Sequence, residues 1–370
     1  MILNLLSIVN FKNYQNIQIE LSDSVNCFLG DNGVGKTNLL DAIYYLSFCK
    51  SYFNTSDFDS MRYGNDYFMI RGDFKNDNEN LFQVNFGFKN KRKTLKFNKK
   101  KYQKLSDHIG KIPLVIITPM DSNLIVGRSD LRRKFFDILL SQLYPNYLTN
   151  LVQYNRVLRQ RNAMLKKSNI NSGYLDLIST YDNKLSVLGH DICTMRLNII
   201  SLIIDSVQNY YSIISEQREI IDIEYNSQLL DADFSELLKN NIHKDKILKF
   251  TTVGIHRDDF NFKLNNYSLK NSGSQGQQKS FIIALKFAYY DILKSILKLN
   301  PILLLDDIFD KLDNNRLEKI IRILNQNKFG QIFITDTNYD RINKIMHKVD
   351  NNCKYFLFNQ FGEYEEKFKE

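Results

Sequence analysis

The sequence is poor in the residues that build zinc sites and disulfide frameworks. Its 370 residues include only four cysteines, Cys27, Cys49, Cys193 and Cys353, which lie far apart and form no CxxC pair. This spacing argues against both kinds of site and favours a reducing cytoplasm. The five histidines are equally scattered and show no metal-ligand spacing.

Long hydrophobic segments are also missing from the sequence. The N-terminus lacks the basic region and the continuous apolar stretch of a signal peptide. No run approaches the length needed to cross a bilayer. The apolar content of 43% and the charged content of 25% are ordinary for a soluble globular chain. We therefore predict a soluble cytoplasmic protein without a membrane partner.

Acidic residues are absent between Asn80 and Ser106, whereas the chain as a whole carries a net charge of +9. Residues 89–104, KNKRKTLKFNKKKYQK, contain nine lysines and arginines. An excess of positive charge favours a polyanionic partner, and the alternating pattern around this run suggests a hairpin with an exposed basic edge. Lys99, Lys100 and Lys101 are candidate DNA contacts. A merely solvated face is an equal alternative, since Asn, Lys and Ile are abundant throughout, as AT-rich coding would produce.

The order of patterns along the chain predicts an α/β fold with a helical insertion. The first ninety residues read mainly as short strands, with a helix at 37–48 and a buried strand at 112–118. After Asp121 the spacing becomes helical, and no proline occurs between Pro145 and Pro301. Strands return near 219–226 and 259–266. We predict an α/β head at 1–120 and 251–370 and a mostly helical arm at 121–250.

Residues 30–37, GDNGVGKT, form a complete GxxxxGK[ST] phosphate-binding loop between a predicted strand and a predicted helix. Backbone N–H groups and the helix N-terminus of such a loop bind phosphates. Lys36 is expected to reach the β- and γ-phosphates of ATP, and the Thr37 hydroxyl is expected to bind Mg²⁺. The predicted nucleotide contacts are Gly30, Asp31, Asn32, Gly33, Val34, Gly35, Lys36 and Thr37.

A second motif, PILLLDDIFDKLD at 301–313, places two carboxylates directly after a buried strand. Adjacent buried anions are unfavourable unless a cation compensates them. In P-loop NTPases a carboxylate at this position shares the Mg²⁺ with the loop hydroxyl. We assign that role to Asp306, and we predict that Asp307 is the general base that polarises the attacking water.

A third segment, GSQGQQKS at 273–280, precedes a long amphipathic pattern and resembles the SxGQ signature of ABC-type ATPases. The resemblance implies that Ser274, Gly276 and Gln277 bind the γ-phosphate of an ATP held by the opposite subunit. It also implies that DKLD, 310–313, is the D-loop of that interface, with Asp313 near the nucleotide. Two chains would then face each other head to tail, as an ATP-dependent homodimer.

Within that superfamily the whole chain resembles the RecF family of bacterial recombinational repair ATPases. The resemblance rests on VNFKNY (9–14), GDNGVGKTNLLDAIYYLS, ITPMDSNLIVGRSDLRRKFFD (117–137), YNRVLRQRNAML (154–165), GIHRDDF (254–260), GSQGQQKS and LLLDDIFDKLD. Ile255, where the family usually has proline, and Lys311, where many members have glutamate, depart from the family pattern. No histidine follows QIFITDT, and Thr335 and Asp336 stand in that region.

The resemblance implies a weak, DNA-stimulated ATPase that binds single-stranded and gapped duplex DNA. It would load RecA at single-strand gaps and act in replication recovery and SOS induction, with RecR and RecO as partners. Arg132 and Arg133, with Arg128, Arg156 and Arg159, are further DNA candidates, although helix-surface salt bridges explain them nearly as well.

Two alternatives remain open: a transporter's nucleotide-binding subunit, and an ATP-binding DNA scaffold without significant hydrolysis. The first conflicts with the helical arm and the missing histidine. The gap from Thr37 to Ser274 is too short for the long coiled coil of a chromosome-maintenance ATPase.

Overall fold

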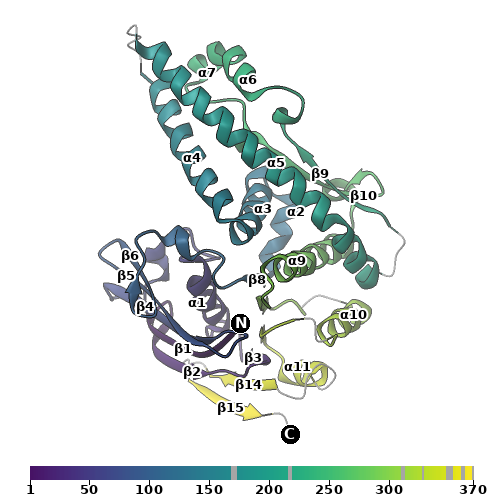
Figure 1. The fold of residues 1–370 in the computed structure, drawn as a ribbon. Helices are drawn as coiled ribbons and strands as arrows, with labels where there is room; N and C mark the ends of the chain where they lie inside the picture. Colours follow the sequence, from purple (N-terminus) through teal and green to yellow (C-terminus); the bar gives the residue numbers. More distant parts are fainter. Residues whose placement is uncertain are drawn as a thin grey trace. The chain divides into compact units, whose positions relative to one another are not determined.

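The computed structural model describes residues 1–167, 173–215, 219–309, 313–326, 329–346, 353–359 and 363–368. The chain divides into two compact units (Figure 1). The head unit comprises Met1–Asp121, Ile213–Glu216 and Ile283–Glu370, and the arm unit comprises Ser122–Ser212 and Gln217–Ile282. The domain limits 1–120, 121–250 and 251–370 stay a prediction, and the compact arm unit extends past residue 250 to Ile282.

The head unit begins with an antiparallel sheet in the strand order β2-β1-β4-β5-β6-β7. Side chains along β4 alternate between buried and more exposed positions, as expected for a sheet with one face on the core. Its strands are β1 (Ile2–Phe11), β2 (Tyr14–Glu20), β4 (Tyr67–Lys75), β5 (Leu81–Lys89), β6 (Arg92–Phe97) and β7 (Lys100–Lys101).

A second sheet of the head unit has the order β15-β14-β3-β13-β12-β8 and is parallel except for the β14–β15 pair. Every residue of β3, β12 and β13 is buried, as continuous apolar strands of a parallel sheet require. The strands are β3 (Val25–Leu29), β8 (Leu114–Ile117), β12 (Ile302–Asp306), β13 (Ile332–Asp336), β14 (Cys353–Phe358) and β15 (Tyr364–Phe368).

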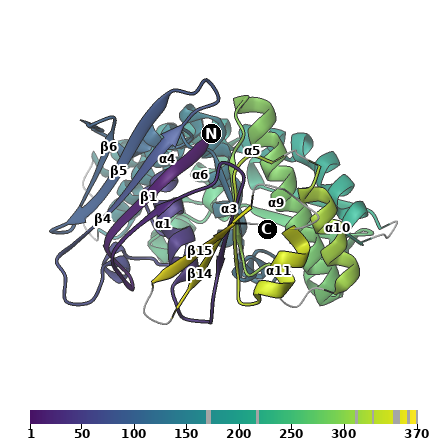
Figure 2. The same cartoon turned by 90° about the horizontal axis from the view of Figure 1, so that it is seen from below.

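Helix α1 (Lys36–Phe48) lies between these two sheets and contacts β4 and β5 on one side and β12 and β13 on the other (Figures 1 and 2). This position explains why all of its residues except Thr37 and Asn38 are buried. Helices α10 (Asn314–Leu324) and α11 (Tyr339–Met346) lie on the other side of the parallel sheet. The P-loop helix is therefore fixed by apolar packing on two faces.

The arm unit confirms the predicted, mostly helical insertion. Long helices α4 and α5 run side by side (Figure 1), and a small antiparallel sheet has the order β11-β10-β9. The elements are α2 (Asn123–Val126), α3 (Ser129–Leu143), α4 (Pro145–Leu165), α5 (Gly173–Ser215), β9 (Ile221–Asn226), α6 (Phe234–Asn240), α7 (Ile242–Leu248), β10 (Asp259–Leu264), β11 (Tyr267–Ser268), α8 (Leu269–Ser272) and α9 (Gln275–Leu297). Helix α9 begins in the arm unit and ends in the head unit.

One helix meets the length and composition of a membrane-crossing segment, although the sequence has no continuous apolar run of that length. Among the described residues, the stretch Asp176–Ser215 of α5 is long and apolar enough to cross a membrane, with a mean hydropathy of 1.4 in its most apolar window. The prediction considered continuous apolar runs, whereas the apolar residues of α5 are interspersed with polar ones. In the arm unit, Ile199, Ile203 and Val207 of this helix are buried in the core. The buried Arg196 on the same helix forms ion pairs with two aspartates.

Candidate functional site

The P-loop connects β3 to α1, and its three glycines, Gly30, Gly33 and Gly35, all have positive φ. Gly30 has a φ of 146°, and a Cβ atom there would lie 2.5 Å from the carbonyl oxygen of Phe358. Gly35 has a φ of 110°, and a Cβ there would lie 2.3 Å from the side-chain nitrogen of Asn13. Both positions combine a left-handed backbone with a close neighbour, so a larger residue at either one would distort the loop.

Asn13 and Tyr14, which follow β1, contact the P-loop, and the sequence did not predict this contact. The side-chain amide of Asn13 donates to the carbonyl oxygen of Val34 at 3.0 Å and accepts from Asn38 at 2.7 Å. Tyr14 is buried beside Gly35, and its hydroxyl has no hydrogen-bond partner among the described residues. The motif VNFKNY could have suggested this contact only through its resemblance to the family, because no local pattern places it against residue 35.

Lys36 is the first residue of α1, and its amine is turned back onto the P-loop. It donates to the carbonyl oxygens of Gly30 and Asp31, each at 2.8 Å. Burial lowers the pKa of this lysine, and the negative charges of Asp307, Asp336, Asp306 and Asp31 oppose that shift. The carboxylates near Lys36 thus outnumber the cations, although Asp336 also pairs with Arg341 at 2.7 Å, and this excess of negative charge favours the binding of a further cation.

Thr37 and Asp306 meet although they are 269 positions apart in the chain. The Thr37 hydroxyl donates to Oδ1 of Asp306 at 2.8 Å, and the Thr335 hydroxyl donates to the same oxygen at 2.8 Å. Asp306 ends β12, and it pairs in register with Thr335 at the end of β13. Burial raises the pKa of Asp306, while the two hydroxyls and the charge of Lys36 oppose this rise.

Asp307 follows β12 in a left-handed conformation, with a φ of 46°. Its backbone N–H donates to the Thr335 hydroxyl oxygen at 3.0 Å. A non-glycine residue at positive φ is uncommon and costs about 1 kcal/mol or more, so the surrounding structure must hold it there. The carboxyl group at this position is half-buried and acts electrostatically on Lys36.

These residues suit Mg²⁺ better than a softer metal. The Thr37 hydroxyl donates its hydrogen to Asp306, which leaves an oxygen lone pair for a cation, and Asp306 adds a carboxylate oxygen. Mg²⁺ prefers oxygen ligands and is usually bound by one or two protein groups together with phosphates and water. No cluster of three His, Cys, Asp or Glu side chains able to hold a metal occurs within the described residues.

The predicted signature segment begins α9 in the arm unit. Ser274 and Gln277 form a reciprocal capping pair: the Ser274 N–H donates to Oε1 of Gln277 at 2.7 Å, and the Gln277 N–H donates to Oγ of Ser274 at 3.2 Å. Ser274 is exposed and Gly276 is half-buried. Their roles toward nucleotide stay a prediction.

The predicted D-loop lies mostly outside the described residues, since only Asp313 of residues 310–313 is described. Asp313 caps α10 by accepting a hydrogen bond from the backbone N–H of Arg316 at 2.9 Å. It also pairs with the Arg316 guanidinium at 3.1 Å, and its side chain is exposed.

The basic run folds as two consecutive tight turns in the head unit. Asn90 and Lys91 connect β5 to β6 at positive φ, and Asn98 and Lys99 connect β6 to β7 in the same way. Lys99, Lys100 and Lys101 are exposed, and β7 forms the edge of its sheet. The predicted hairpin with an exposed basic edge is thus present, while its contact with DNA stays a prediction.

Arg132 and Arg133 are engaged inside the arm unit. The Arg132 guanidinium forms two hydrogen bonds with the carboxylate of Asp259, at 2.7 and 2.9 Å, and is 9% exposed. Arg133 donates to the Ser129 hydroxyl at 2.9 Å and to the Asp258 carbonyl oxygen at 2.5 Å. The buried Arg132 thus forms a salt bridge to β10 and Arg133 bonds neutral oxygens, neither of which is the expected helix-surface salt bridge, and a DNA role for either residue stays a prediction.

The segment GIHRDDF is the centre of an arginine–aspartate cluster that the sequence did not reveal. Arg196 on α5 pairs with Asp137 on α3 at 2.8 Å and with Asp258 at 2.9 Å. Tyr225 on β9 also donates to Asp258. We call Asp137, Arg196, Tyr225 and Asp258 the arginine cluster; these residues come from four segments of the arm unit.

His256, in the same motif, has structural partners. Its Nε2 lies 3.1 Å from the carbonyl oxygen of Thr251, so Nε2 carries the hydrogen and Nδ1 accepts from the Tyr154 hydroxyl at 2.9 Å. Burial lowers the pKa of His256 to about 4. The ring is therefore neutral at physiological pH.

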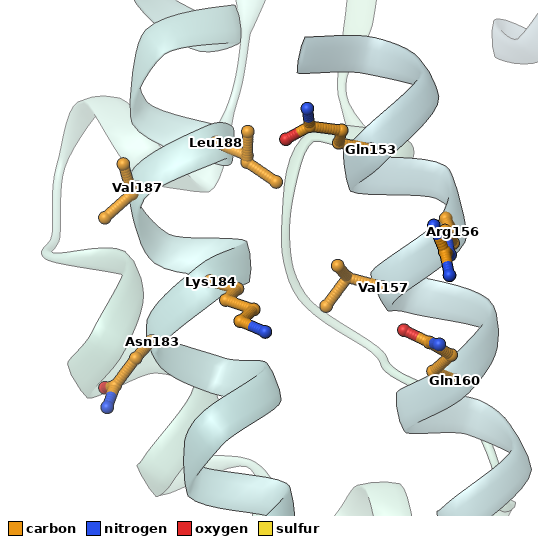
Figure 3. A pocket seen from close by; sticks show the side chains of 8 residues that line it. All are labelled: Gln153, Arg156, Val157, Gln160, Asn183, Lys184, Val187 and Leu188. Atoms are coloured by element: carbon orange, nitrogen blue, oxygen red, sulfur yellow. The ribbon is translucent and has the colours of Figure 1, made fainter. Parts of the chain in front are cut away.

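A groove of about 740 Å³ lies between α4 and α5 of the arm unit (Figure 3). Arg156 and Lys184 supply positive charge, and Val157 and Leu188 extend into the space between the two helices. The remaining lining residues are Gln153, Gln160, Asn183 and Val187. The groove lining thus contains cations, amides and aliphatic groups but no carboxylate.

Comparison with known proteins defines the class first. Residues 2–359 match the family model described as "RecF/RecN/SMC N terminal domain". The head of an Smc protein from Pyrococcus furiosus has the same fold, with a TM-score of 0.58 and 13% identity over 99% of this chain and 96% of that one. The predicted fold class, an ABC-type P-loop ATPase head with an inserted helical arm, is confirmed.

Closer relatives identify the family within this class. The chain is 42% identical over 361 residues to the "DNA replication and repair protein RecF" of Bacteroides thetaiotaomicron, covering 97% of each chain. The protein of that name from Azobacteroides pseudotrichonymphae is 44% identical, over 96% of this chain and 97% of that one. A solved structure described as "recombination mediator protein RecF-ATP in RecFOR pathway" has a TM-score of 0.88 and 29% identity, covering 99% and 97% of the two chains. The chain belongs to the RecF family. This result replaces the alternative that the chain is a transporter's nucleotide-binding subunit.

Proposed function

We propose that this protein is an ATP-dependent DNA-binding ATPase of recombinational repair and replication recovery. Two copies would face each other head to tail, with two ATP molecules between them. The observation that carries the proposal is the meeting of Thr37 and Asp306, because it joins the P-loop to the carboxylate strand in the way that magnesium-dependent NTPases require. The family's solved ATP complex supports the choice of nucleotide.

Each residue at the strand ends has a role in this proposal. Lys36 and the backbone N–H groups of Gly30–Thr37 bind the phosphates, and Thr37 and Asp306 hold Mg²⁺. When bound, Mg²⁺ neutralises charge on the phosphate oxygens. Asp307 accepts a proton from the attacking water. The hydrogen bond from its backbone N–H to the Thr335 hydroxyl oxygen fixes the backbone that carries this carboxylate.

The composite site takes its other half from the second chain. Ser274 and Gly276 at the N-terminus of α9 would bind the γ-phosphate of the ATP held by the partner's P-loop. The Ser274 oxygen accepts the Gln277 N–H, so its own hydrogen is available to a phosphate oxygen. The positive end of the 23-residue helix adds to this attraction.

DNA binding is supported by two basic surfaces. One is the β6–β7 hairpin with Lys99, Lys100 and Lys101, and the other is the groove with Arg156 and Lys184 (Figure 3). Phosphate contacts of this kind give affinity without sequence preference. We place single-stranded and gapped duplex DNA on these surfaces, with RecR and RecO as partners in RecA loading and SOS induction, in line with the named pathway of the solved relative.

Sedimentation with Mg·ATP tests the proposal. The wild-type chain should form a dimer with ATP and a monomer without it, and DNA should raise its ATP turnover. Lys36→Ala removes the charge that faces the phosphates and should abolish the ATP-dependent dimer while the fold is retained. A dimer that forms equally well with Lys36→Ala would contradict the P-loop assignment, and dimerisation without turnover would favour the non-hydrolysing scaffold.

A further inference from the structure

A chain of hydrogen bonds leads from helix α5 to the signature segment within the arm unit. The Tyr211 hydroxyl on α5 donates to Oε2 of Glu219 at 2.5 Å. Oε1 of Glu219 accepts from the side-chain nitrogen of Gln277 at 2.6 Å. Gln277 in turn bonds the backbone N–H and the hydroxyl oxygen of Ser274. Tyr211 is fully buried, whereas Glu219 and Gln277 are half-buried.

We propose that Glu219 is a positioning residue for the composite ATP site, acting through Gln277 on Ser274. The inference rests on the proposed function, since it assumes that Ser274 binds an ATP held by the partner chain. Glu219 itself would touch neither nucleotide nor DNA. It would hold Ser274, at the N-terminus of α9, in position before the second chain binds.

The chemistry of the carboxylate explains why glutamate suits this position. An ionised carboxylate only accepts hydrogen bonds, so Gln277 must present its NH₂ group to Glu219. The amide oxygen of Gln277 is then directed to the Ser274 N–H, which completes the capping pair. Without Glu219 the amide can rotate, and Ser274 is less restrained when it has to meet the phosphate. Such a loss of pre-organisation lowers the rate without removing a contact to substrate.

The hydrogen bond from Tyr211 also links Glu219 to helix α5. Helix α5 also lines the groove of Figure 3 through Lys184, so DNA bound there contacts the helix that supports Glu219. Through Tyr211, Glu219 is thus joined to the helix that also lines this groove. Tyr211→Phe removes the bond to α5 and leaves Gln277 with its acceptor. It should reduce the stimulation of ATP turnover by DNA more than the turnover without DNA.

A mixing experiment tests the role of Glu219. Ser274→Arg supplies an intact P-loop and a blocked signature, whereas Lys36→Ala supplies the reverse. Their mixture has one working composite site, located in the mixed dimer. Adding Glu219→Ala to the Lys36→Ala chain places the change beside the working Ser274, and it should lower ATP turnover about 10- to 100-fold, the effect of one hydrogen bond to a charged group. Adding Glu219→Ala to the Ser274→Arg chain should give the rate of the parent mixture.

A conservative variant and a stability measurement separate positioning from folding. Glu219→Gln can still accept from Gln277 and should restore most of the rate in the sensitive arrangement. Each Glu219→Ala chain should unfold at the same temperature as its parent variant, which would show that both chains fold. If both arrangements turned over at the parent rate, Glu219 would have no positioning role. If the parent mixture itself were inactive, the two-chain site of the proposed function would be wrong instead.

Discussion

The strand ends of the head unit and the arginine cluster of the arm unit both gather charged residues from distant parts of the chain. At the strand ends, Lys36 is surrounded by four carboxylates. In the arginine cluster, Arg196 pairs with Asp137 and Asp258, and a tyrosine hydroxyl supplies a further hydrogen bond. The negative excess is larger in the first set, with four carboxylates against Lys36 and the Arg341 that pairs with Asp336, than in the second, with two carboxylates against Arg196.

The difference shows how to separate a ligand site from a structural network when both carry family motifs. An excess of buried charge is unfavourable until a ligand of opposite charge binds, so it indicates function. A balanced set stabilises the fold if every member keeps its partner. Asp306 and Asp307 belong to the first kind, whereas Arg132 with Asp259 resembles the second.

The largest expected effect concerns Asp307. Asp307→Asn keeps the size of the side chain but removes the proton acceptor, so ATP turnover should fall about 10²- to 10⁴-fold while ATP binding is retained. Single-turnover hydrolysis and equilibrium binding of ATP measure the two quantities. Asp306→Asn is the matched control, because it should instead weaken Mg²⁺ coordination and raise the Mg²⁺ concentration needed for turnover. Wild-type turnover of Asp307→Asn would assign water activation to another group.

Breaking the arginine cluster should cost folding stability instead of catalysis. Arg196→Met leaves the buried Asp258 and the half-buried Asp137 without their cation, and the free energy of unfolding should fall by about 3–5 kcal/mol. Arg156→Met on the neighbouring helix α4 is the control, because Arg156 is exposed, and it should change stability by about 0.5 kcal/mol or less. Urea unfolding of both variants decides the matter. Equal stabilities would mean that the arginine cluster is not structural.

His256 makes the stability of the arm unit depend on pH. Its folded pKa of about 4 lies below the usual value of 6.5 because of burial, so unfolding takes up a proton below pH 6.5. The stabilisation is complete above that pH and is lost as the pH falls toward 4, by about 3 kcal/mol in total. Urea unfolding at pH 7 and at pH 5 should show a smaller difference for His256→Ala than for the wild-type chain. An unchanged difference would mean that other groups carry the pH dependence.

The smallest effect is expected at the basic hairpin. Lys99, Lys100 and Lys101 changed together to Gln should weaken DNA binding for all sequences alike. The slope of log K against log salt should become smaller by two to three, at about 0.9 per lost phosphate contact. ATP affinity and folding should be unchanged because these side chains are exposed. Wild-type affinity and slope in the triple variant would leave the hairpin as a solvated face and shift attention to Arg156 and Lys184.

The sequence predicted those parts of the molecule that depend on contiguous residues. The P-loop, the carboxylate strand and the long helices are each built from one continuous segment. Residue pattern and spacing were therefore sufficient to predict them. Thr335 joins Asp306 only through the register of two parallel strands, which no local pattern determines. Likewise, Arg132 finds Asp259 across 127 positions. An arginine on an amphipathic helix looks the same in sequence whether it faces DNA or an aspartate of the same protein.

The measurement that tests the central claim most directly is ATP turnover in mixtures of Ser274→Arg and Lys36→Ala. Each variant alone should be nearly inactive, because one lacks a working signature and the other lacks phosphate binding. The mixture should recover turnover and ATP-dependent dimerisation, since one composite site with both halves intact forms in each mixed dimer. Lower ATP affinity of isolated Ser274→Arg monomers, or a mixture no more active than its components, would contradict a nucleotide site shared between two chains.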